Sequence, residues 1–170
     1  MKLIIGTLLA LVTILGVGVY NTKAEPLTPA PIQRILVKED TGGRLDWYMK
    51  SLDMIKKAGL GVRFDGMCAS ACTMIVSEQF NLDVCVTENA KLGIHHPFLM
   101  SSDGEISYSI PSIAQANQIW SEVFYKKYPE WLRKFIDANN GAPDVYLGAK
   151  TSDMLEVPYT ELSKHMATCQ

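Results

Sequence analysis

The apolar positions of the chain form short strand-like runs that alternate with helical repeats. Apolar runs occur at residues 34–38, 61–64 and 83–87, and a further run ends at His95. Between the first two runs, apolar residues recur at the spacing of a helix that ends at Gly59, namely Leu45, Tyr48, Met49, Leu52 and Ile55. Another helix is expected from Ser70 through Val76. Strands that alternate with helices in this way predict an α/β fold, with right-handed βα crossovers and a parallel sheet.

The second half of the sequence is predicted to be mostly helical. Residues 98–110 are polar and rich in serine, which indicates a loop or hairpin. Pro111 then opens a long helix with apolar residues on one face, and Pro129 ends it. A further helix is expected over residues 130–138, and a last helix-like segment over residues 159–166.

The N-terminal residues are typical of an export signal. Lys2 is followed by an apolar run over residues 3–20, and the small residue Ala24 precedes a proline-rich stretch. This pattern predicts a signal peptide over residues 1–24. An uncleaved membrane anchor is the alternative, because a run of about 18 apolar residues reaches the lower limit for spanning a bilayer. An extended leader (25–33) and a single domain (34–170) are expected to follow, exported to the periplasm or out of the cell.

The charged residues are balanced and interspersed along the chain. The formal net charge is −2 at neutral pH. Neither a basic face for nucleic acid nor a polybasic patch for a membrane surface is expected. Nucleic acid is therefore excluded as a partner, and membrane contact is expected only through residues 3–20 if they are not cleaved.

Four cysteines lie in the exported part: Cys68, Cys72, Cys85 and Cys169. An oxidising compartment favours disulfides, and three pairings are open. A strand that follows the Ser70 helix can run beside the turn before it, which favours a bond from Cys85 to Cys68 or Cys72. A zinc site from Cys68, Cys72, Cys85 and a histidine is the rival, although Cys-x3-Cys without a second close pair is a weak zinc pattern. Oxidation also disfavours Cys72 as a nucleophile.

Ser70 is the candidate nucleophile. It lies between Ala69 and Ala71, where an apolar strand runs into a helix. A serine hydroxyl needs a neighbouring base to take its proton, and backbone N–H groups must receive the oxyanion that develops on the substrate. The N–H of Ala71 is a natural donor, because it lies in the first turn of the helix. The alternative is that Ser70 only caps this helix.

Two adjacent histidines, His95 and His96, provide the candidate base. Successive side chains of a strand face opposite ways, so only one of the two rings can meet Ser70. The alternative for either ring is a structural role, with a hydrogen bond to the backbone.

Three separated stretches together resemble the ClpP/crotonase superfamily, and within it the secreted ClpP-like proteins with a Cys-x-Ser-Ala-Cys-Thr motif followed by Gly-x-His. Residues 39–43 resemble the Pro-Gly-Gly oxyanion turn, residues 66–71 the nucleophile turn, and residues 94–97 the Ile-His-Gln-Pro stretch that carries the base. The resemblance covers Ile35 to Pro97. The chain departs from it with Thr41 in place of proline, His96 in place of glutamine, and cysteines on both sides of the serine.

The resemblance implies a fold and a set of roles. The fold would be the repeated βαβ superhelix of ClpP and crotonase, in a single domain. Ser70 would be the nucleophile, His95 the general base, and the N–H groups of Gly42 and Ala71 the oxyanion hole. The acid that orients His95 would be Asp153, just before residues 154–158, with Asp144 as second choice.

The function implied is an exported serine hydrolase, specifically a peptidase, acting on a peptide or protein without a cofactor or metal. Members of the superfamily assemble into rings, so a homo-oligomer is expected. The alternative is a non-enzymatic binding or assembly module, because this fold serves many chemistries. Coenzyme A thioester chemistry fits poorly with export.

Overall fold

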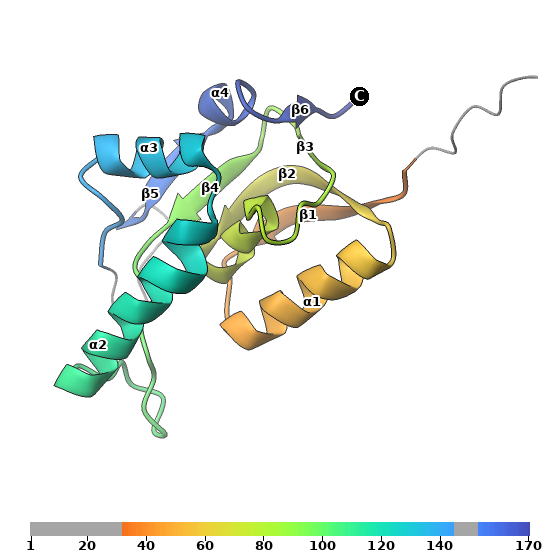
Figure 1. Cartoon of the computed structure of the whole chain (residues 1–170). Helices are drawn as coiled ribbons and strands as arrows, with labels where there is room; N and C mark the ends of the chain where they lie inside the picture. The colour runs from red at the N-terminus through yellow and green to blue at the C-terminus, as the bar shows by residue number, and fades with distance from the viewer. Residues whose placement is uncertain (1–31, 145–152) are drawn as a thin grey trace, which may run out of the picture. The chain divides into compact units, whose positions relative to one another are not determined.

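The computed structural model describes residues 32–144 and 153–170 (Figure 1). The predicted signal peptide or anchor, 1–24, lies outside the described residues, as does the leader except for Ile32 and Gln33. Within these two ranges, no helix has the length and apolar character needed to cross a bilayer.

The described chain has a mixed α/β fold built on a curled, mostly parallel six-stranded sheet (Figure 1). The strands are β1 (Arg34–Asp40), β2 (Gly61–Ala69), β3 (Val84–Val86), β4 (Lys91–Ile94), β5 (Leu155–Pro158) and β6 (Ala167–Thr168). Strand β2 pairs in parallel with β1, β3 and β4, and β3 pairs in parallel with β6. The α/β prediction and the mostly parallel sheet are confirmed. Strand β5, which pairs antiparallel with β4, was not expected.

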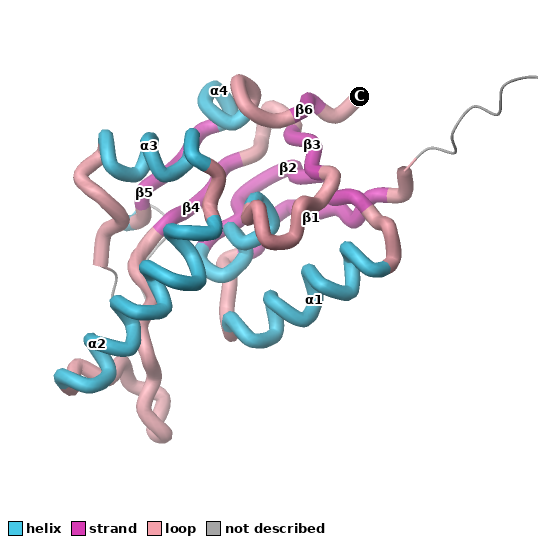
Figure 2. The backbone as a smooth tube through the Cα atoms, in the orientation of Figure 1, coloured by secondary structure: helices cyan, strands magenta, loops and turns pink. Residues whose placement is uncertain are grey.

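The helices follow the predicted pattern with local differences. They are α1 (Leu45–Lys57), the 3₁₀ helix η1 (Ser70–Val76), α2 (Ile110–Ile119), the π-helical turn η2 (Trp120–Phe124), the 3₁₀ turn η3 (Tyr125–Lys127), α3 (Glu130–Ala138) and α4 (Tyr159–Leu162). The long helix before Pro129 therefore contains three helix types in succession. Between β4 and α2 the chain is a loop that is closed by one bridge between Met100 and Ile106, as the serine-rich pattern predicts (Figure 2).

A bulge in β2 determines which strands lie beside the candidate nucleophile. Val37 pairs with Phe64 but Glu39 pairs with Met67, so β2 has one residue more than β1 between these pairs. Gly66 is required there, because a Cβ on it would lie 1.7 Å from the carbonyl oxygen of Lys38. Such a bulge bends a strand. The first half of β2 pairs with β3 and the second half with β4.

One hydrophobic cluster supports the second half of β2. Its fully buried side chains come from the sheet, from η1 and from the C-terminal helices: Phe64, Met74, Leu92, Ile94, Tyr128, Leu132, Ile136 and Leu162. The turn that carries Ser70 directly follows β2, so the main chain before Ser70 is held by the packed core.

The two disulfides correct the predicted pairing. Cys68 is bonded to Cys72, and Cys85 is bonded to Cys169. The prediction that Cys85 pairs with Cys68 or Cys72 is wrong, for two structural reasons. The tight 3₁₀ turn brings Cys72 back over the end of β2, and the pairing of β3 with β6 carries Cys169 alongside Cys85. Two disulfides are consistent with an oxidising, exported environment.

Candidate active site

Ser70 stands at a strained turn between β2 and η1. Ala69 is still extended, with φ −117° and ψ 161°, whereas Ser70 has φ 55°. Within the described ranges, the other non-glycine residues with positive φ are Asn81 and Asn140, and asparagine tolerates this conformation better than most residues. The left-handed conformation at a serine costs on the order of 1 kcal/mol, and such strain is concentrated at functional sites.

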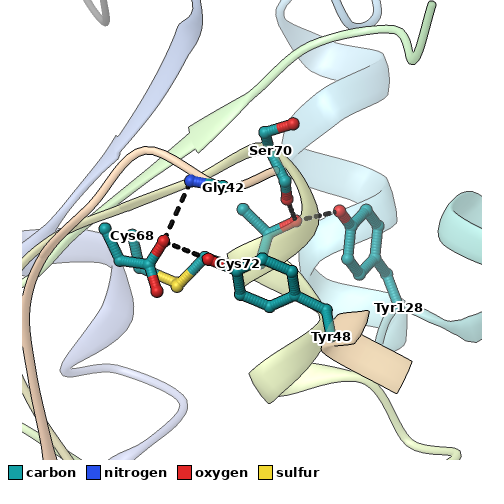
Figure 3. The surroundings of a disulfide bond; sticks show 8 residues. Gly42, Tyr48, Cys68, Ser70, Cys72 and Tyr128 are labelled. Atoms are coloured by element: carbon teal, nitrogen blue, oxygen red, sulfur yellow. Dashed lines mark hydrogen bonds between the residues drawn. A yellow bond between two sulfur atoms is a disulfide. The ribbon is translucent and has the colours of Figure 1, made fainter. Parts of the chain in front are cut away.

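The Cys68–Cys72 disulfide closes the turn around Ser70 (Figure 3). The two Cα atoms are 5.3 Å apart, and Ser70 lies midway between the cysteines in the sequence. Both cysteines are buried, while Ser70 is half-buried. Thr73 adds a second constraint, because its hydroxyl donates to the carbonyl oxygen of Ser70 at 2.6 Å. The main chain on both sides of Ser70 is therefore fixed.

Gly42 lies directly against this turn, and its predicted role in an oxyanion hole stays a prediction. A Cβ built on Gly42 would lie 2.5 Å from Cβ of Ser70 and 3.0 Å from the backbone nitrogen of Ala71. Gly42 also has φ +85°, which other residues rarely adopt. The fold thus brings together Gly42, Ser70 and Ala71 from segments that are distant in the sequence.

The N–H of Gly42 is already hydrogen-bonded within the chain, to Asp40. That N–H donates to Oδ1 of Asp40 at 2.9 Å, and the hydroxyl of Tyr48 donates to the same oxygen (Figure 3). Burial, and then the hydrogen bond to Asp40, raise the pKa of Tyr48 well above its ordinary value, so its proton stays in place. Sequence reasoning missed both residues. An aspartate two residues before a glycine is the pattern of an Asx turn, and that pattern was available for Asp40.

His95 follows the strand next to Ser70. Ala69 pairs with Gly93 in the parallel ladder of β2 and β4, so Ser70 and His95 leave neighbouring strands at the same end of the sheet. His95 is 7% exposed, and Nδ1 lies 2.6 Å from the carbonyl oxygen of His96. A carbonyl only accepts, so Nδ1 carries the proton and Nε2 has the free lone pair. Burial lowers the pKa of His95, the largest effect on it, so its ring is neutral near neutral pH.

Ser70 Oγ and His95 share no hydrogen bond in the described part of the chain. Catalytic hydrogen bonds are often long in the absence of substrate and tighten only in the complex. The predicted contact of Ser70 with His95 therefore stays a prediction. His96 has other neighbours, since its ring stacks on Trp120 with 4.7 Å between centroids.

The two candidate acids lie near the end of β4. Leu155 of β5 pairs with Ile94, which directly precedes His95. Asp153 is exposed and lies two residues before Leu155. Among the residues that the structure describes, Nδ1 of His95 contacts the His96 carbonyl. The role of Asp153 stays a prediction. The charge of Asp144 raises the pKa of His96, although desolvation of that ring lowers it more.

All four cysteines form disulfides, so none of them has a thiolate that could bind zinc. Among the residues that the structure describes, no cluster of three or more potential metal ligands occurs. What the site can supply is a serine hydroxyl, a neutral imidazole and the main-chain N–H groups of a tight turn.

Comparison of the sequence with protein-family models and with curated protein sequences finds no match. Any function is therefore argued from the geometry around Ser70.

Proposed function

We propose that this chain is an exported serine hydrolase that cleaves peptide or protein substrates, built on a ClpP/crotonase-like fold. One observation carries the proposal. Ser70 is held in a left-handed conformation against Gly42. It directly follows β2, which pairs with β4, and His95 directly follows β4. Strain of this kind costs stability, so its presence at a serine that follows the strand next to that of a buried histidine favours a chemical role over a structural one.

In the proposed reaction Ser70 Oγ attacks the carbonyl carbon of an amide or ester. The proton moves from Oγ to Nε2 of His95, which is the unprotonated nitrogen. The N–H of Ala71, at the start of η1, receives the developing oxyanion, and the N–H of Gly42 joins it after release from Asp40. His95 then returns its proton to the leaving group. Water, deprotonated by His95, attacks the acyl carbon, the bond to Ser70 Oγ breaks, and Oγ takes the proton back from His95 as the carboxylic acid leaves.

A non-enzymatic binding module is the second candidate. The observation that favours it is the hydrogen bond from Gly42 to Asp40, which fills one of the two expected oxyanion donors from within the chain. In a module of this kind the turn would have a structural role only, and the N–H of Gly42 would stay hydrogen-bonded to Asp40.

Labelling with a fluorophosphonate separates the two candidates. The full chain should become labelled at Ser70, as located by peptide mass spectrometry, and Ser70→Ala and His95→Gln should abolish labelling. Ser77→Ala is the matched control, because Ser77 lies at the other end of η1 and should leave labelling unchanged. Absence of label from Ser70 in the folded wild type would favour the binding module.

The orienting acid is tested by Asp153→Asn. Loss of a triad acid lowers turnover on the order of 10⁴-fold while the fold is kept. Glu156→Gln is the control, since Glu156 is exposed on β5 and forms an ion pair with Lys91. If Asp153→Asn is fully active and Asp144→Asn is not, Asp144 is the acid; full activity of both variants would assign the orientation of His95 to the His96 carbonyl.

Homo-oligomer formation also belongs to the proposal. Its support is a group of exposed apolar side chains on and beside α2: Met100, Tyr108, Ile110 and Ile113. A contiguous apolar patch of exposed side chains is typical of an interaction surface, and the proposal requires these four to form one. Light scattering of the purified chain tests it, and a monomeric mass at micromolar concentration would contradict it.

A further inference from the structure

The orientation of the His95 ring depends on the main chain of its neighbour. The contact from Nδ1 to the His96 carbonyl, at 2.6 Å, is its only polar contact in the described part of the chain. If that carbonyl rotates away, Nδ1 loses its acceptor and the proton can move to Nε2. His95 would then present a donor, and not an acceptor, towards a serine. Whatever fixes the His96 peptide therefore fixes the protonation pattern of His95.

Two contacts hold His96 in place. Its N–H donates to the carbonyl oxygen of Pro143 at 2.9 Å. Its ring stacks on the indole of Trp120, with centroids 4.7 Å apart and an angle of 29° between the planes. The first contact fixes one end of the residue and the second fixes its side chain. Removal of the indole would take away this stacking partner of the His96 ring.

Trp120 is itself held within an aromatic cluster. Its ring lies 6.2 Å from Phe124, 6.0 Å from Tyr125 and 6.3 Å from Tyr128, between centroids. Trp120 is also the first residue of the π-helical turn η2. Such turns are rare in proteins, and those that occur are often found at functional sites. This irregularity lies where the helix meets His96.

The same cluster reaches the nucleophile. Tyr128 is fully buried, and its hydroxyl lies 2.6 Å from Oγ1 of Thr73, which donates to the carbonyl oxygen of Ser70 (Figure 3). A continuous series of contacts thus runs from Ser70 through Thr73, Tyr128 and Trp120 to His96, and from its carbonyl to His95. It joins the nucleophile and the base on the side of the helices, whereas the sheet joins them through β2 and β4.

We propose that Trp120 is a positioning residue for His95. The indole holds the His96 ring, the His96 carbonyl keeps the proton on Nδ1, and Nε2 stays free to accept the proton of Ser70. The inference rests on the proposed serine hydrolase function for its consequence in activity. The link from Trp120 to the His95 tautomer stands without it.

The first test measures the tautomer directly. In ¹⁵N spectra of the imidazole rings, with His95 assigned from the spectrum of His95→Gln, the wild type should carry its proton on Nδ1. Trp120→Leu removes the flat ring and should give a mixture of the two tautomers. Trp120→Phe keeps an aromatic face and should retain the wild-type pattern. A wild-type His95 with its proton on Nε2 would overturn the proposal without any variant, even if Trp120→Leu failed to fold.

The second test measures fluorophosphonate labelling of Ser70 in the same proteins. Misplacement of a catalytic group by about 1 Å can slow a reaction on the order of 10²-fold, and we expect such a loss for Trp120→Leu and recovery in Trp120→Phe. Trp131→Leu is the matched control. Trp131 is also half-buried and also stacks on a histidine, His165, at 4.7 Å, but outside this series of contacts. It should keep both the tautomer and the labelling rate.

The two readouts separate failure of this inference from failure of the proposed function. If Ser70 is labelled in the wild type and a folded Trp120→Leu keeps both its tautomer and its rate, the positioning role is refuted and the hydrolase stands. If Ser70 is never labelled but Trp120→Leu shifts the His95 tautomer, the positioning role is supported and the hydrolase fails.

Discussion

The left-handed conformation of Ser70 should reverse the usual stability order of alanine and glycine. Ser70→Ala and Ser70→Gly both remove the hydroxyl and create no new contact. They differ in the backbone, because glycine adopts φ 55° freely while alanine is as strained there as serine. The pair therefore measures the strain at Ser70 in isolation from its chemistry.

The size of the effect follows from two opposing terms. The left-handed region costs an L-residue with a Cβ about 1–2 kcal/mol. Glycine loses about 0.5–1 kcal/mol more in backbone entropy on folding than alanine does. The difference of these terms is about 0 to 1.5 kcal/mol, so Ser70→Gly should be more stable than Ser70→Ala by about 0.75 kcal/mol at the midpoints. At an unstrained position the sign is opposite.

Equilibrium unfolding in urea, with the disulfides intact, measures the difference. Ser77 supplies the control pair, because it lies at the other end of η1 with φ −67°. There, Ser77→Ala should be more stable than Ser77→Gly. If Ser70→Ala proved as stable as Ser70→Gly or more so, Ser70 would not be held in the left-handed region, and the observation that carries the proposed function would fall.

Three further predictions concern the surroundings of Ser70. Gly42→Ala should cost about 2–4 kcal/mol in urea unfolding, because its Cβ meets Ser70 and its φ is positive, whereas Gly104→Ala, in open space with φ +90°, should lose only about 1 kcal/mol. By loop entropy, replacing the Cys85–Cys169 bond by serines should cost about 4–5 kcal/mol and replacing the Cys68–Cys72 bond about 2 kcal/mol, since their sequence separations are 84 and 4. Burial lowers the pKa of His95 below its ordinary 6.5, so the labelling rate should fall only at pH values below 6.5. The neutral ring also contributes stability, which should be lost as the pH falls below 6.5, as measured by unfolding of the wild type against His95→Gln.

Local patterns predicted the elements that fold from their own residues. The apolar repeat of α1 and the boundaries of α3 depend on neighbouring positions, and both were found where the spacing placed them. Strands β5 and β6 are different. They are short, and they become strands only through their partners β4 and β3. Nothing in their own sequence indicates such long-range pairing.

The cysteine pairing and the Asp40 contact needed information of the same long-range kind. Cys169 reaches Cys85 only because β6 pairs in parallel with β3. The approach of Gly42 to Ser70 was expected from resemblance, whereas the carboxylate that fills its N–H was not. Sequence patterns predicted Ser70, His95 and Gly42 as one site, and that grouping stays a prediction, whereas the hydrogen bonds of Gly42 and His95 depend on side-chain positions that the sequence does not give.

Gly42 approaches the main chain on both sides of Ser70, whereas the Cβ of Ala69 faces β4, where a Cβ built on Gly93 would lie 2.9 Å from it. Ala69 and Ala71 are both buried, and the carbonyl oxygen of Ala69 lies 2.6 Å from the position that a Cβ on Gly42 would take. Two main-chain segments are thus in contact, so there is no room between them for side chains. This close packing fixes the main chain of Gly42 relative to that of Ser70 and Ala71. In the proposed hydrolase the N–H of Ala71 would be a preorganised oxyanion donor, whereas the N–H of Gly42 would first have to leave Asp40.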